Sequence, residues 1–492
     1  MFLLVNDSLN KDYGSMVSDT DCLIMAGEKY PEIKGEGEEP TGYYNYGFDK
    51  TDIEKELPKQ TVKQIQHEEE ILKSEKWYSI LTQVSVPFFI AGIGTIAAGT
   101  VLATVTTYKV FDDIRALYVL VPALLGLKGN LDMCLSSRLS TRANLGHMDD
   151  RRELLKMVVG NIVLVQIQAI VASCIVSVFA TSASALINGN FQWIHTLLLA
   201  TASTLTATMS CFILDILLVT VIVISHKIKL NPDNLATPLA ASVGDLVSLI
   251  VLSSWARLLY TIHDKYPWLM GLILGGYILV LLPLWIYIVK RNEYTRTILT
   301  QGWTPVITAL FISGTGGLIL DVGVDSFKGY TVFQPIINGI GGNLVSVQVS
   351  RTSTMLHKTA IFGQMPSITK QLVWPWTALI KGVHPAKTAR LLILLSIPGH
   401  TIFVFAADFF YNKESTVTPT FVFMYLTVGL IQLVILLYGC HLLVHTMWRF
   451  KRDPDNSAIP YLTAIGDLSG SGFLLIGFII LRSFHAEYKP VV

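Results

Sequence analysis

Residues 122–141 read PALLGLKGNLDMCLSSRLST, and residues 335–354 read PIINGIGGNLVSVQVSRTST. The two segments align without a gap, and 9 of 20 positions are identical. A second pair, PDNLATPLAASVGDL at 232–246 and PDNSAIPYLTAIGDL at 454–468, shares 8 of 15 positions. The offsets within the two pairs, 213 and 222 residues, are similar. One unit of the chain is therefore duplicated.

The chain that carries these segments is too apolar for a water-soluble protein. Of its 492 residues, 51% are hydrophobic and only 15% are charged, whereas about a quarter of the residues in soluble proteins are charged. Residues 1–76 are polar and rich in Gly and Glu, which predicts a disordered cytoplasmic tail. The remainder predicts an all-α, polytopic membrane protein in contact with lipid. A net charge of +1 without a basic stripe gives no reason to expect nucleic acid as a partner.

Stretches long enough to cross a bilayer follow from residue 84 onwards. We predict about eleven transmembrane helices, at 84–108, 117–141, 155–181, 194–225, 237–260, 267–289, 303–325, 331–355, 386–410, 419–448 and 459–482. The stretch at 331–355 is weakly apolar because it is rich in Gly, Ser and Gln. Connections on the side of the N-terminus hold 19 Lys and Arg residues, and those on the other side hold 8. This imbalance predicts a cytoplasmic N-terminus and an extracellular C-terminus.

Each copy of the duplicated unit contains five predicted helices, and the helix at 267–289 lies between the copies. An odd number of helices would invert the second copy, but the extra helix turns the chain around. The two five-helix repeats are therefore predicted to be parallel, with a pseudo-twofold axis along the membrane normal. This divides the chain into the tail at 1–76, a first repeat at 77–262, a linker helix at 263–302 and a second repeat at 303–492.

Four polar side chains fall near the middle of their predicted helices. Asn130 and Asn343 lie 13 and 12 residues into their helices, and Asp245 and Asp467 each lie 8 residues into theirs. A carboxylate at this depth costs about 2.5–3.5 kcal/mol, so a duplicated pair indicates function. Oxygen ligands without His or Cys suit a hard cation such as Mg²⁺, which gives up its water reluctantly. Each polar residue has a glycine beside it that would expose backbone carbonyls to the ion path, namely Gly129, Gly342, Gly244 and Gly466.

The two repeats differ in charge close to these residues. Lys128 precedes the Gly-Asn pair of the first repeat, where the second repeat has Gly341. Asp215 stands opposite Leu437 and is interpreted as an accessory polar contact. A lysine near an ion path would repel or regulate cations, so strict equivalence of the two halves is not expected.

These motifs resemble the solute carrier family 41 magnesium transporters, relatives of the bacterial MgtE-type channels. The resemblance rests on PALLGLKGN with SSRLST, on PIINGIGGN with SRTST, and on the GDL triplets at 244–246 and 466–468. It covers roughly residues 80–482. It implies that one polypeptide imitates the bacterial homodimer and carries Mg²⁺, with other divalent cations as further candidates, on the pseudo-twofold axis. A monomer would then suffice to form the pore.

The resemblance also assigns roles to individual residues. It matches Asp245 and Asp467 to the pore aspartates of the fifth helix of each repeat. It matches Asn130 and Asn343 to the asparagine of the Gly-Asn motif. The family implies a plasma-membrane location by default.

We therefore expect a Mg²⁺ transporter and not an enzyme. A channel and an exchanger that uses Na⁺ as its coupling ion are both open, because the sequence shows no separate Na⁺ site. The alternative is an intramembrane aspartyl protease in which Asp245 and Asp467 share a proton. Such enzymes of the GxGD type have a glycine where this chain has Ser242 and Ala464.

Overall fold

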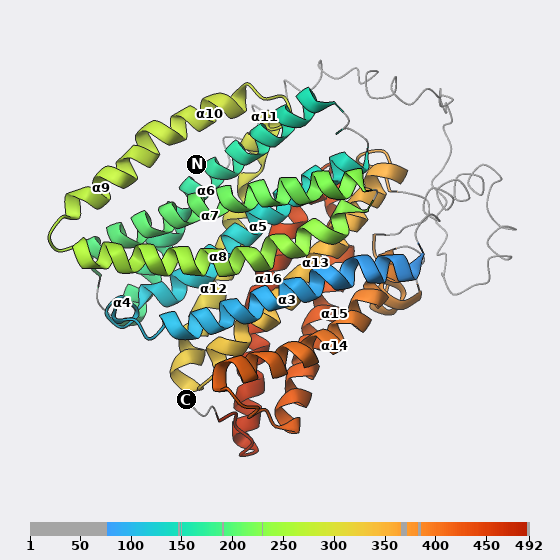
Figure 1. Ribbon diagram of the computed structural model, residues 1–492. Helices are drawn as coiled ribbons and strands as arrows, with labels where there is room; N and C mark the ends of the chain where they lie inside the picture. The colour runs from blue at the N-terminus through green and yellow to red at the C-terminus, as the bar shows by residue number, and fades with distance from the viewer. Residues whose placement is uncertain are drawn as a thin grey trace, which may run out of the picture. The chain divides into compact units, whose positions relative to one another are not determined.

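The computed structural model describes residues 76–145, 148, 150–188, 191–228, 230–365, 371–381 and 385–489. The tail predicted at 1–76 lies outside these residues except for Lys76. Long helices make up the described chain, which contains no strand (Figure 1). The long helices outside the linker are α3 (Trp77–Val105), α5 (Ala116–Asn144), α6 (Arg151–Asn188), α7 (Trp193–Lys227), α8 (Pro232–Ile262), α12 (Trp303–Ser326), α13 (Tyr330–Thr359), α14 (Pro385–Asn412), α15 (Pro419–Arg449) and α16 (Pro454–Ser483).

A linker joins α8 to α12. It consists of α9 (Pro267–Gly276), the π-helical turn η2 (Tyr277–Leu281) and α10 (Leu282–Lys290). The linker packs on α6 and α7 of the first repeat. The short helices α4 (Lys109–Asp113) and α11 (Arg296–Gln301) and the turn η3 (Thr377–Lys381) complete the described secondary structure.

The predicted all-α, polytopic fold is confirmed. Ten helices of the described chain, counting the linker as one, are long and apolar enough to cross a membrane. The helix α13, predicted at 331–355, has the length to span but lacks the hydropathy, and nearly all of its side chains are buried among other helices. A weakly apolar helix is stable there because protein, and not lipid, surrounds it.

Proline sets several helix boundaries that hydropathy alone misplaces. The helices α8 and α16 begin at Pro232 and Pro454, five residues before the predicted apolar stretches. A proline fits the first helical position because its φ angle is already helical and its missing N–H would have no partner there. The helices α9, α14 and α15 begin in the same way, at Pro267, Pro385 and Pro419.

The pseudo-twofold axis runs between α5 and α13. The Ser137 hydroxyl donates to the Ser350 hydroxyl at 3.1 Å. One turn further on, the hydroxyl oxygens of Thr141 and Thr354 are 3.5 Å apart. Both pairs are separated by 213 residues, the offset of the aligned repeats. A residue that touches its own counterpart lies beside the symmetry axis, and two such pairs one turn apart place this axis along both helices.

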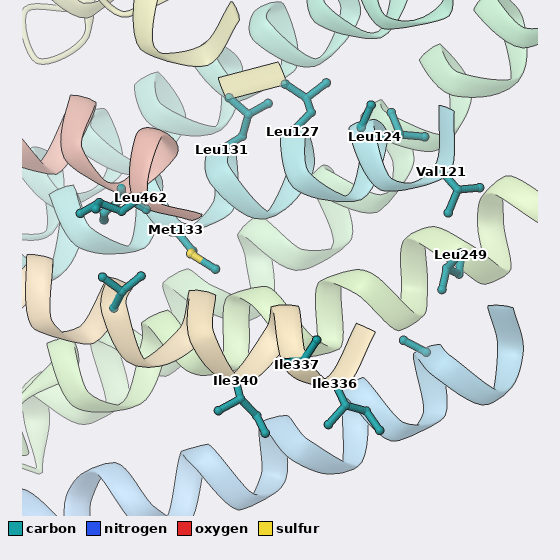
Figure 2. Packing of buried hydrophobic residues seen from close by; sticks show 14 of the residues in the cluster. Val121, Leu124, Leu127, Leu131, Met133, Leu249, Ile336, Ile337, Ile340 and Leu462 are labelled. Carbon is teal, nitrogen blue, oxygen red and sulfur yellow. The ribbon is translucent and has the colours of Figure 1, made fainter. Parts of the chain in front are cut away.

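The first helix of each repeat packs against the other repeat. Helix α3 contacts α8 of its own repeat and α13 of the second, while α12 contacts α16 of its own repeat and α5 of the first. Figure 2 shows Ile336 and Ile340 of α13 pointing toward α3. The hydrophobic core is therefore continuous across the two halves.

Glycines allow these exchanged helices to approach closely. A β-carbon added at Gly99 of α3 would lie 2.6 Å from the carbonyl oxygen of Val332 in α13. A β-carbon added at Gly317 of α12 would lie 2.9 Å from the carbonyl oxygen of Val119 in α5. Val119 and Val332 are counterparts in the aligned repeats, so the same small-residue contact is made twice.

Candidate cation site

Asp467 lies where helices of both repeats meet. Its Oδ2 accepts a hydrogen bond of 2.9 Å from the Ser313 hydroxyl of α12. The same oxygen lies 2.9 Å from the place where Gly126 of α5 would carry a β-carbon. The Asn338 amide of α13 donates to the backbone carbonyl of Asp467 at 3.2 Å. Four helices, α5, α12, α13 and α16, thus fix the position of this aspartate.

Asp245 of α8 lies in the electrostatic field of Asp467. The two carboxylates interact, although they come from opposite repeats. Asp245 also interacts with Lys128 and Asp132 of α5. Asp245 is thus within electrostatic range of Asp467, and the pairing of the two aspartates at one ion site stays a prediction. Two carboxylates that repel each other in a low-dielectric setting favour a cation between them.

Asn130 and Asn343 are both buried on the helices beside the axis. The Asn130 Oδ1 accepts a hydrogen bond from the Thr463 hydroxyl of α16. The methyl group of Thr463 lies 3.9 Å from the place where Gly342 of α13 would carry a β-carbon. One threonine of α16 thus contacts the Gly-Asn motifs of both repeats and orients the Asn130 carboxamide.

The four glycines predicted for the ion path differ in their surroundings. A β-carbon at Gly129 would meet nothing within 4 Å, and one at Gly342 would meet only Thr463, at 3.9 Å. A β-carbon at Gly466 would lie 3.4 Å from Leu436, an ordinary contact. At Gly244 it would lie 2.6 Å from the Lys128 ammonium nitrogen. Gly129 and Gly342, which precede the two asparagines, therefore border open space, whereas Gly244 leaves room for the Lys128 ammonium group.

Gly244→Ala should be more harmful than the equivalent change Gly466→Ala. An added methyl group at residue 244 must displace the buried Lys128 ammonium from Asp132, which we expect to cost about 1–3 kcal/mol. At residue 466 the methyl group makes only ordinary contacts, with Leu436 at 3.4 Å and the Gly342 backbone nitrogen at 3.9 Å, and alanine favours the helix. Thermal unfolding of the two purified variants measures the difference. Equal destabilisation would show that the Lys128 contact does not require the glycine.

The sequence reasoning did not single out Asp132 or Ser313. Asp132 stands four residues after Lys128 inside an apolar stretch, and this opposite-charge spacing on one helix face is the signal that reveals it. Ser313 is an ordinary residue of an apolar helix, and only the packing of α12 on α16 reveals its role. Asp215, interpreted as an accessory contact, is buried within the electrostatic field of both Asp132 and Lys128.

A second polar cluster lies at the end of the axis where α5 and α13 finish. His357, Asp453 and Asp455 have ligand atoms within 4.8 Å of one another, the one group of this kind that the described residues contain. Asp455 accepts hydrogen bonds from Ser137 at 2.7 Å and from Thr141 at 2.8 Å. These are the hydroxyls that touch their repeat counterparts, so acidic groups also flank the axis at this end.

Comparison with known proteins identifies the family of the chain. Residues 121–255 and 334–477 match the MgtE family, a divalent cation transporter. Solute carrier family 41 member 2 of Xenopus laevis is 43% identical over 83% of this chain and 73% of its own length. The human member 2 is 42% identical over 80% of this chain and 69% of its own length. Member 3 of Rattus norvegicus is 40% identical over 82% of this chain and 88% of its own length. No solved structure matches the chain. The resemblance in the sequence is therefore confirmed, and the chain belongs to solute carrier family 41, with the MgtE divalent cation transporter domain in two segments.

Proposed function

We propose that this protein carries Mg²⁺ across a membrane along the pseudo-twofold axis, between Asp245 and Asp467. The observation that supports this most is the position of Asp467, which is fixed by helices of both repeats through Ser313, Asn338 and Gly126 and acts electrostatically on Asp245 of the first repeat. Asn130 and Asn343 would supply carboxamide groups beside them. Family membership supports a divalent cation as the substrate.

A hydrated ion fits the chemistry of these groups. Mg²⁺ keeps several of its waters, so the carboxylates would accept hydrogen bonds from the water shell and would not bind the metal directly. The open space beside Gly129 and Gly342 lies next to the two asparagines, where backbone carbonyls add further acceptors. Binding through the water shell of the ion is weak enough for the ion to leave again, which conduction requires.

One chain supplies both halves of this path. We divide it into repeats at 77–262 and 303–492, joined by the linker at 263–302, and a monomer is then sufficient to form the pore. Positive residues in the connections support a cytoplasmic N-terminus and an extracellular C-terminus. The plasma membrane is the proposed location.

The protease alternative has no support. No hydrogen bond joins Asp245 to Asp467, both of which lie in the described part of the chain, whereas two catalytic aspartates must share a proton. Asp467 instead accepts its hydrogen bond from Ser313. The family of the chain is one of transporters.

Flux into proteoliposomes tests the proposal and separates the two transport modes. The purified protein is reconstituted with a Mg²⁺-sensitive dye inside, and uptake is recorded with and without an opposing Na⁺ gradient and at set membrane voltages. We expect Mg²⁺ uptake far above that of empty vesicles. An exchanger stops without the Na⁺ gradient, whereas the flux through a channel follows the voltage. No uptake under any of these conditions would overturn the proposed function.

A further inference from the structure

The first repeat contains a buried group of charges that the second repeat lacks. It consists of Lys128 and Asp132 on α5 and Asp215 on α7, and we call it the Lys128 cluster. The ammonium nitrogen of Lys128 lies 2.9 Å from Asp132 Oδ2, and the two side chains are 1% and 0% exposed. Asp215 is 0% exposed. The counterparts in the second repeat are uncharged, namely Gly341, Val345 and Leu437.

The Lys128 cluster adjoins the proposed ion path. The Lys128 ammonium packs against the backbone of Gly244, the residue before Asp245, at a distance that excludes any side chain there. Asp245 interacts electrostatically with both Lys128 and Asp132. The Lys128 ammonium and Asp132 Oδ2 both border Gly244, at 2.6 Å and 3.7 Å from the place where this glycine would carry a β-carbon.

The cluster contains one carboxyl group more than an ion pair needs. Two carboxylates face a single ammonium group, and neither oxygen of Asp215 has a hydrogen-bond partner among the described residues. A structural ion pair would need only Lys128 and Asp132, which lie one turn apart on the same helix. Such an ion pair does not need Asp215, and burying a carboxyl group without a partner costs free energy. Asp215 therefore increases the capacity of the cluster to hold the ammonium away from Asp245.

We propose that the Lys128 ammonium is a tethered cation that competes with the transported ion for Asp245. When the path is empty, the ammonium balances Asp245. When Mg²⁺ enters, the ion takes over the balancing of Asp245, and the ammonium stays paired with Asp132 at 2.9 Å. This proposal rests on the proposed function, because it presumes that Mg²⁺ passes Asp245.

The tether makes the path selective for divalent over monovalent cations. A free K⁺ or Na⁺ ion carries the same charge as the ammonium but lacks its high local concentration, so it cannot displace the ammonium from Asp245. Mg²⁺ carries twice the charge and gains twice the attraction to the carboxylates. Lys128 is thus a specificity-determining residue that need not touch the ion.

A variant without the cluster tests this proposal. Lys128→Met, Asp132→Val and Asp215→Leu are introduced together, and the last two residues are those of the second repeat. Replacing a complete buried charge group by apolar side chains leaves no unpaired charge, and such changes are often neutral or stabilising. Lys128→Met alone would leave two buried carboxylates without a counter-ion, so it is not a suitable test.

The readout is Mg²⁺ flux into proteoliposomes as a function of Mg²⁺ concentration, at low and at high K⁺. In the unmodified protein, K⁺ should not change the half-saturating Mg²⁺ concentration. In the triple variant at low K⁺, this concentration should fall about tenfold, because Asp245 loses the Lys128 charge, which acts on it more strongly than the Asp132 charge that is removed with it. High K⁺ should then compete with Mg²⁺ and raise the half-saturating concentration again, and tracer Rb⁺ should enter the vesicles.

Gln432→Leu is the matched control. Gln432 packs at the corresponding place in the second repeat, 2.8 Å from where Gly341 would carry a β-carbon, and it donates to the Gly466 carbonyl at 2.8 Å. Its replacement changes the packing beside the second Gly-Asn motif without changing charge, so the response to K⁺ should stay as in the unmodified protein.

Two results would overturn the inference. One is a folded triple variant with the half-saturating Mg²⁺ concentration and K⁺ response of the unmodified protein. The other is a folded triple variant that carries no Mg²⁺. Failure of the proposed function looks different, because the unmodified protein itself would then show no Mg²⁺ flux, and the inference would fall with it.

Discussion

Asp467→Asn and Asp245→Asn should each lower Mg²⁺ flux at sub-saturating concentration by about tenfold or more. Asparagine keeps the shape of the side chain and can still accept the hydrogen bond from Ser313 at residue 467. It removes only the charge. Hydrogen bonds to a charged partner contribute about 1.5–3 kcal/mol, and 1.4 kcal/mol is a factor of ten in binding. The measurement is initial Mg²⁺ uptake into proteoliposomes with equal amounts of protein.

Asp264→Asn provides the control for these two variants. Asp264 lies between α8 and the linker with its side chain 87% exposed, and within the described residues its one ion-pair contact is with His263. Removal of this carboxylate changes the net charge of the chain equally but leaves the axis unaltered. Its flux should match that of the unmodified protein. Normal flux in both axis variants would show that the two aspartates are structural.

Gly99→Ala and Gly317→Ala should each destabilise the fold by about 1–3 kcal/mol, the usual cost of overpacking. The added methyl groups would lie 2.6 Å and 2.9 Å from backbone carbonyl oxygens of the opposite repeat. Backbone cannot rotate away as a side chain can, so the helices themselves must separate. The melting temperature of each purified variant in detergent reports this effect.

Gly271→Ala is the matched comparison for those two glycines. A β-carbon at this position in α9 would meet nothing within 4 Å. Alanine favours a helix over glycine by about 0.8–1.0 kcal/mol, so this variant should be as stable as the unmodified protein or more stable. If all three variants melted alike, the contact of the exchanged helices would not be close.

Much of the fold follows from the sequence, because apolar stretches and duplicated motifs can be recognised from the order of the residues alone. Each predicted stretch falls within a helix or the linker, except that 84–108 extends three residues past the end of α3 at Val105. The duplicated motifs also predict the axis, since the Ser137–Ser350 contact spans the offset of the repeats. The packing of α3 and α12 against the opposite repeat was not predictable. Hydropathy indicates which segments cross the membrane, but it does not indicate which helices pack together.

The candidate site was predictable only in part, for a related reason. A charge in an apolar stretch is visible in the sequence, so Asp245, Asp467 and Lys128 were found. The Ser313 hydroxyl that binds Asp467 lies 154 residues away in the chain, and serine is common in membrane helices. The repeat also suggests that Gly244 and Gly466 are equivalent, because both precede the aspartate of a GDL triplet. Their surroundings differ in the structure, since Gly244 faces the Lys128 ammonium group and Gly466 faces Leu436.

An experimental density map tests the central claim most directly. Structures of the unmodified protein determined with Mg²⁺ and with a chelator are compared by a difference map. We expect a peak on the pseudo-twofold axis between Asp245 and Asp467, with water between the ion and the carboxylate oxygens. A Mg²⁺ peak at another place in the membrane-spanning core, with no density between these two aspartates, would contradict it.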